Sequence, residues 1–219
     1  MNVLAVSAHP DDETLGCGGS LLAHRDSGDV IDWLILTRPD EGRHSREVIS
    51  EKGRQVDEVA GAYGMRTTTQ LEFAAGRLET VAFNEIMNEI VATIQRVQPA
   101  VVYVVSPGDA HTDHGVAFRA TMSVLKPFHM RSLGVNRVQA YETLSSTEAA
   151  APPAFVPNVY RDITSSLEEK LHVMSLYSTE AQPEPLPRSP SALRALARFR
   201  GATVGTEYAE AFSLIRELV

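Results

Sequence analysis

Short apolar runs alternate with helical stretches along the first two thirds of the chain. The runs have strand length, are rich in Val, Leu and Ile, and are bounded by polar residues or glycine. The expected strands are residues 2–8, 30–37, 69–73, 100–106 and 138–143. The stretches between them place apolar residues at helical spacing, and the expected helices are residues 20–25, 47–62, 82–97 and 116–125. This alternation predicts an α/β protein, a Rossmann-like three-layer domain with a mostly parallel central sheet and helices on both faces.

The last third of the chain has a different pattern. Residues 145–157 are rich in Ser, Ala and Pro, which predicts an excursion over the surface. The elements expected after it are helices at residues 167–177 and 192–200 and a strand at the sheet edge at residues 208–218. Too little chain follows the Pro-rich stretch 183–190 to build a second core. We therefore expect one domain over residues 1–219, with residues 145–219 as its C-terminal helical and edge-strand portion.

Composition narrows the class of protein. The net charge of −8 over 219 residues argues against nucleic acid or an anionic membrane as the main partner. The single cysteine, Cys17, excludes an intramolecular disulfide and fits a reducing compartment. No apolar run approaches the ~20 residues that span a bilayer, and the N-terminus lacks the pattern of a signal peptide. These features predict a cytoplasmic protein without an integral membrane segment, and leave a homo-oligomer open.

A first polar cluster, A-H-P-D-D-E at residues 8–13, follows directly after the first expected strand. His9, Asp11 and Asp12 therefore emerge at the carboxyl end of a strand, where ligands bind in open α/β sheets. Pro10 fixes its own φ and disfavours helix at His9, which keeps the imidazole at the strand tip. The cluster is a candidate metal site.

A second polar cluster follows the expected strand 100–106 and contains Asp109, His111, Asp113 and His114. Two strands that deliver His and Asp to the same sheet edge can converge on one ion. A catalytic zinc site needs three protein ligands and one open position, which His9, Asp12 and His114 would provide. Zinc suits this set, although Fe2+ or another divalent metal is also compatible with it. Asp109 is either a turn residue or a partner of one of the ligands.

Three polar residues are left over and could carry the chemistry. Asp11 lies beside the expected ligands, where a hydrolase needs a general base for the attacking water. His111 could stabilise a developing oxyanion or protonate a leaving amine. Asp113 could orient the imidazole of His111.

Together, A-H-P-D-D-E at residues 8–13 and H-T-D-H at residues 111–114 resemble the PIG-L/LmbE-like family of zinc-dependent N-acetyl sugar deacetylases. The resemblance implies that a metal-bound water, activated by Asp11, attacks the acetyl carbonyl of a small N-acetylated amino sugar or its conjugate. The implied metal ligands are His9, Asp12 and His114, and the implied catalytic residues are Asp11, His111 and Asp113. It further implies that Arg54 lies near the substrate entrance. The chain carries Ala74-Ala75 where many relatives have Pro-Asp, so a sugar contact made by that aspartate would be absent.

Three other functions remain alternatives. An amidase acting on a thiol conjugate or another N-acyl amine would use the same residues. A non-haem iron oxygenase also uses two histidines and one carboxylate, but it would leave Asp11 and His111 unexplained. A non-enzymatic sugar-binding domain on the same fold is the third alternative, against which an intact candidate base and acid both argue.

Overall fold

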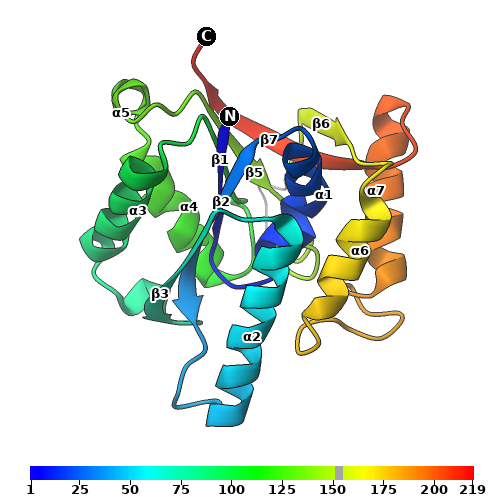
Figure 1. Cartoon of the computed structure of the whole chain (residues 1–219), viewed down its shortest axis with the longest axis horizontal. Helices are drawn as coiled ribbons and strands as arrows, with labels where there is room; N and C mark the ends of the chain where they lie inside the picture. The colour runs from blue at the N-terminus through cyan, green and yellow to red at the C-terminus, as the bar shows by residue number, and fades with distance from the viewer. Residues whose placement is uncertain (151–154) are drawn as a thin grey trace.

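A single seven-stranded sheet runs through the molecule (Figure 1). The structure, a computed structural model, describes residues 1–150 and 155–219; residues 151–154 of the expected surface excursion lie outside the described part. The strands are β1 (Asn2–Ser7), β2 (Val30–Arg38), β3 (Thr67–Ala74), β4 (Val101–Val105), β5 (Arg137–Tyr141), β6 (Val159–Asp162) and β7 (Ala209–Glu217). Their order is β3-β2-β1-β4-β5-β7-β6, and β1 to β5 are all parallel. The sheet confirms the predicted α/β class.

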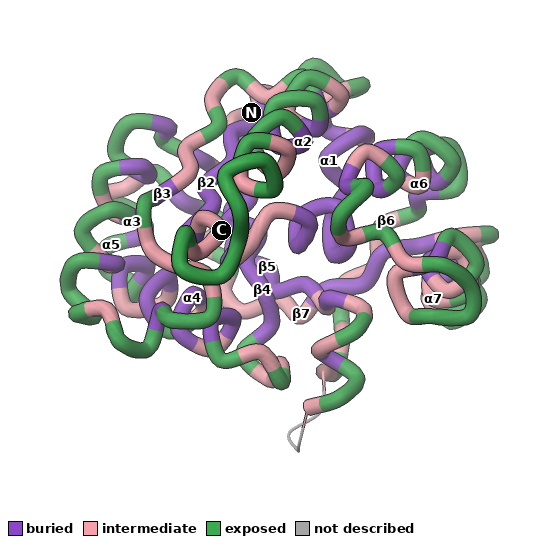
Figure 2. The backbone as a smooth tube through the Cα atoms, turned by 90° about the horizontal axis from the view of Figure 1, so that it is seen from below, coloured by how far each residue is buried: buried purple, intermediate pink, exposed green. Residues whose placement is uncertain are grey.

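Helices cover both faces of this sheet in three layers (Figure 2). The helices are α1 (Asp12–Asp26), α2 (Arg46–Tyr63), α3 (Phe83–Val97), α4 (Thr112–Val124), α5 (Pro127–Ser132), α6 (Leu167–Leu176) and α7 (Pro190–Val204), with a short 3-10 turn at Leu78–Thr80. α1, α2 and α6 pack together on one side, and α3 and α4 pack together on the other. The apolar stripe of α3, which includes Ile86, Ile90 and Ile94, is fully buried against the sheet.

The order of the strands positions the site. β1 pairs with β2 on one side and with β4 on the other, so the chain direction across the sheet reverses between β1 and β4. At such a switch point the loops after the two strands diverge to opposite faces and leave a crevice at their carboxyl ends. Both polar clusters follow these two strands, and they therefore meet there.

The expected edge strand was placed wrongly. β7 pairs antiparallel with β5 and also with β6, so it lies inside the sheet and β6 forms the edge. Strand β6 was not predicted because it has only four residues, V-Y-R-D, without an alternating apolar pattern. The short helix α5 was not predicted either.

The start of the first helix was also predicted incorrectly, since the helix was expected over residues 20–25. α1 begins at Asp12 and contains Gly16, Gly18 and Gly19. A Cβ at Gly16 would lie 2.0 Å from Cδ2 of Tyr141, and one at Gly19 would lie 2.8 Å from Cγ2 of Ile163. The glycines are thus compatible with the helix because they let α1 pack directly onto its neighbours. No described helix is both long enough and apolar enough to cross a bilayer.

Candidate metal centre and active site

A cavity of about 360 Å³ opens at the carboxyl ends of the parallel strands. The loops after β1, β2 and β4 line it, together with α2, the segment after β5 and the segment between α6 and α7. Five of the predicted site residues line this cavity: His9, Asp11, Asp12, His111 and His114. The structure therefore brings both polar clusters to one cavity.

Two imidazoles and one carboxylate converge at the base of the cavity. Nδ1 of His9 lies 3.3 Å from Nε2 of His114. Asp12 places Oδ1 3.2 Å from Nε2 of His114 and Oδ2 3.7 Å from Nδ1 of His9. Atoms bound to one tetrahedral zinc at ~2.0–2.2 Å have mutual separations of this size. These three residues therefore fit a divalent cation.

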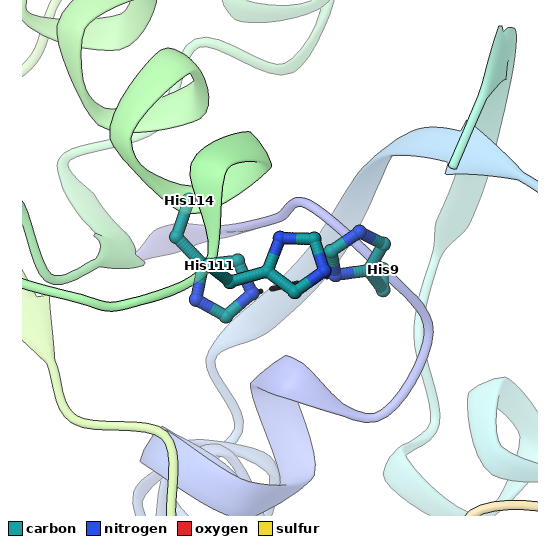
Figure 3. A group of neighbouring side chains, drawn as sticks. All are labelled: His9, His111 and His114. Atoms are coloured by element: carbon teal, nitrogen blue, oxygen red, sulfur yellow. Dashed lines mark hydrogen bonds between the residues drawn. The ribbon is translucent and has the colours of Figure 1, made fainter. Parts of the chain in front are cut away.

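His111 adds a fourth donor beside the other three. Ring nitrogens of His9, His111 and His114 all lie within 4.8 Å of one another. In Figure 3 the His111 and His114 side chains extend from the start of α4 toward His9, which lies on the loop after β1. The site thus offers more donors than the three that an open catalytic site needs.

The outer nitrogen of each expected histidine ligand contacts a carboxylate. Nε2 of His9 lies 2.9 Å from Oδ2 of Asp113, and Nδ1 of His114 lies 3.1 Å from Oδ1 of Asp109. Carboxylates in this position fix the tautomer and orientation of metal-binding imidazoles. Asp109 is therefore a partner of His114. Asp113 was expected to orient His111, but its carboxylate contacts His9, and only its backbone N–H donates to Nδ1 of His111, at 3.2 Å.

The base of the cavity favours positive charge. Burial would raise the pKa of Asp12, but the adjacent imidazoles of His114 and His9 lower it to about 2. Burial would lower the pKa of His114, but Asp12 and Asp109 raise it to about 10. A divalent cation at this place would be attracted by the same carboxylates. Burial and the neighbouring His9 and His114 lower the pKa of His111 below its usual value.

Asp11 lies next to this centre in an unusual conformation. It precedes α1 with φ of 104°, a region that few residues other than glycine adopt. Its backbone N–H donates to Oε2 of the fully buried Glu13 at 3.2 Å. Oδ2 of Asp11 accepts a hydrogen bond from Nη1 of Arg188 at 2.7 Å. Burial, followed by the charge of Asp12, raises the pKa of Asp11 well above its usual value.

Several residues that line the cavity were not predicted from the sequence. Arg54 lies on the exposed face of α2 and pairs with Glu51 and Glu58, away from the cavity lining. Lys52 and Gln55, almost one helical turn apart, line the cavity instead. Each lies four residues before a buried valine, Val56 or Val59, so helical spacing could have indicated that both face the interior.

The segment between α6 and α7 also contributes to the lining, through Thr179, Glu180 and Arg188. It contains the Pro-rich stretch 183–190, in which no motif indicated a role. Ala75 of the Ala74-Ala75 pair also lines the cavity. The departure from the Pro-Asp of many relatives therefore falls on a surface that substrate could reach.

Comparison with known proteins places the chain in a family. The family described as PIG-L: GlcNAc-PI de-N-acetylase matches residues 4–125, which include both polar clusters. The diacetylchitobiose deacetylase of Thermococcus kodakarensis is 25% identical over 97% of this chain and 82% of its own. The crystal structure of the conserved protein TT1542 from Thermus thermophilus superposes with a TM-score of 0.80 and 25% identity, covering 99% of this chain and 96% of that one. GalB, a 4-carboxy-2-hydroxymuconate hydratase from Pseudomonas putida, shares the fold with a TM-score of 0.77 and 19% identity, over 100% of this chain and 97% of that one. With more than half of its residues matched, this chain belongs to the PIG-L family.

Proposed function

We propose that the protein is a metal-dependent hydrolase that removes the N-acetyl group from an amino sugar or an amino-sugar conjugate. One observation carries the proposal: His9, Asp12 and His114 converge on one point, while the separate carboxylate of Asp11 lines the same cavity. The similarity to a diacetylchitobiose deacetylase supports N-acetylated amino sugars as the substrate class. The cavity has the size of a small-ligand site.

Zinc is the metal that we propose for this site. His9, Asp12 and His114 would hold it, because their donor atoms face one another and Asp113 and Asp109 orient the two imidazoles. When bound, the metal would polarise the acetyl carbonyl and make water easier to deprotonate. Fe2+ would fit the same donors, and metal analysis of the purified protein distinguishes the two.

Asp11 is the proposed general base. It lies in the cavity, and its raised pKa makes it a better proton acceptor than an exposed aspartate. It would take a proton from the attacking water and pass it to the amine nitrogen when the amide C–N bond breaks. Acetate and a free amino sugar would result.

His111 is the proposed donor to the carbonyl oxygen. Its Nδ1 accepts a hydrogen bond from the backbone N–H of Asp113, and its lowered pKa favours the neutral ring. The ring proton of a neutral His111 must therefore lie on Nε2. That N–H can donate to the negative charge that develops on the carbonyl oxygen during attack.

Acetate release from zinc-loaded protein tests this function. The panel should contain N-acetylglucosamine, N,N'-diacetylchitobiose and nucleotide-, lipid- and thiol-linked N-acetylglucosamine. We expect release from at least one of them, equally with and without oxygen. A requirement for oxygen would favour the oxygenase alternative, and binding without acetate release would favour the sugar-binding alternative.

Asp11→Ala separates the base from the metal site. We expect the variant to bind zinc as wild type does and to lose ~10²–10⁴-fold in kcat, because it lacks the proton acceptor. Asp57→Ala, on the exposed face of α2, is the matched control and should retain full activity. Turnover near the wild-type rate in Asp11→Ala would remove Asp11 from the mechanism.

A further inference from the structure

Arg188 contacts the proposed general base from a segment 177 residues away in the chain. Its Nη1 donates to Oδ2 of Asp11 at 2.7 Å and to Oε2 of Glu180 at 3.0 Å. Glu180 in turn forms an ion pair with Lys52 of α2. The four side chains form a line of alternating charge, Lys52–Glu180–Arg188–Asp11, that ends at the proposed general base.

The segment that carries Arg188 is held in place at both sides of this residue. The backbone N–H of Arg188 donates to Oε1 of Gln182 at 3.1 Å. The next residue, Ser189, is fully buried and caps α7 by accepting the N–H of Ala192 at 3.3 Å. The guanidinium is therefore delivered from a fixed backbone, as a positioning group requires.

The surroundings of Asp11 explain why it needs such a partner. The carboxylate is nearly buried and lies among other acidic groups, Asp12, Glu13 and Glu180. A buried carboxylate without a cation is costly, and its acidic neighbours would repel it from its present position. Within the described part of the chain, Oδ2 is bonded to Arg188 and Oδ1 makes no hydrogen bond. Oδ1 is thus free for a proton from water.

We propose that Arg188 is a positioning residue that holds the Asp11 carboxylate in place, with Glu180 and Lys52 fixing the guanidinium. The proposal rests on the proposed function, in which Asp11 is the general base. It assigns a role in the reaction to the segment between α6 and α7, which lies outside the residues matched to the family.

Kinetics of Arg188→Met with a substrate from the panel test this role. We expect kcat to fall ~10–100-fold while KM stays within about two-fold, because the base is misplaced but substrate contacts remain. Arg188→Lys should recover part of the loss, since an ammonium can still pair with Asp11. The matched control is Arg194→Met, which removes a partly exposed arginine of α7 that pairs with Glu168, and it should leave kcat and KM unchanged.

A crystal structure of zinc-loaded Arg188→Met gives a measurement that does not depend on turnover. We expect the Asp11 carboxylate to turn away from its wild-type position, while His9, Asp12 and His114 keep theirs. An unmoved Asp11, an unchanged kcat, or a loss confined to KM would overturn the proposal. If wild-type protein releases no acetate from any substrate, the proposed function fails, and the position of Asp11 in the variant still decides whether Arg188 places it.

Discussion

The carboxylate of Asp113 lies 2.9 Å from Nε2 of His9, although the two residues are 104 positions apart. The same carboxylate accepts the backbone N–H groups of Gly76 and Leu78 at 2.6 and 3.0 Å. Asp113 thus joins the loop after β1, the start of α4 and the segment after β3. The same side chain therefore contacts the proposed metal ligand His9 and the segment at Gly76 that lines the cavity.

Replacing Asp113 by Asn should weaken metal binding. The amide keeps the shape of the side chain but loses the charge that orients His9, so we expect zinc affinity to fall ~10–100-fold. Competition with a chromogenic chelator measures it, and Asp57→Asn on the exposed face of α2 is the control. A zinc affinity equal to that of wild type in Asp113→Asn would show that the contact between Asp113 and His9 does not strengthen metal binding.

Arg54 and Lys52 should behave differently when each is replaced by Met. Arg54 is exposed and paired with Glu51 and Glu58, so we expect its replacement to leave KM and kcat almost unchanged. Lys52 lines the cavity and pairs with Glu180, so its replacement should lower kcat/KM measurably. A rise in KM for Arg54→Met alone would instead support the role near the substrate entrance that the family resemblance implies.

Gly16→Ala should destabilise the protein in spite of the higher helix propensity of alanine. The new Cβ would lie 2.0 Å from the buried ring of Tyr141, and such overpacking costs ~1–3 kcal/mol. Gly53→Ala, inside α2 with no atom within 4 Å of the new Cβ, is the control and should stabilise by ~0.5–1 kcal/mol. Urea unfolding measures both, and equal stability changes in the two variants would contradict the packing argument.

His24 should make stability fall in mild acid. Its Nδ1 lies 2.7 Å from Oδ2 of Asp29, and its Nε2 lies 3.0 Å from Nη1 of Arg161, which can donate only to an unprotonated nitrogen. Burial is the main cause that lowers the pKa of His24. The charge of Arg161 also lowers this pKa, whereas Asp29 raises it. The unfolded chain therefore binds the proton more readily, so stability is lost as the pH falls through the unfolded pKa of ~6.5.

Urea midpoints between pH 8 and pH 5, in excess chelator, measure this effect. We expect His24→Gln to lose part of the wild-type decrease, while His129→Gln, at an exposed position on α5, keeps all of it. Identical pH profiles for wild type and His24→Gln would show that the folded and unfolded states bind the His24 proton equally well.

The sequence predicted those parts of the fold and site that depend on local pattern. The parallel strands β1, β2 and β4 consist mainly of apolar residues, and the two polar clusters follow β1 and β4 in the chain. Side chains that act through distant contacts were not predictable in this way. Arg188 reaches Asp11 across 177 positions, and Asp113 contacts His9 instead of its sequence neighbour His111. The start of α1 was not predictable either, because the close contacts of its glycines with Tyr141 and Ile163 exist only in the folded protein.

The placement of β7 between β5 and β6 has a consequence for how the molecule assembles. β7 also carries Glu210, whose carboxylate accepts the N–H groups of Gly19 and Ser20 in α1 at 2.7 and 2.8 Å. Until residues 209–217 have been synthesised, β5 lacks one neighbour and the first helix lacks these bonds. Since contacts between such distant segments form slowly, we expect the nascent chain to complete its fold only after this strand has left the ribosome.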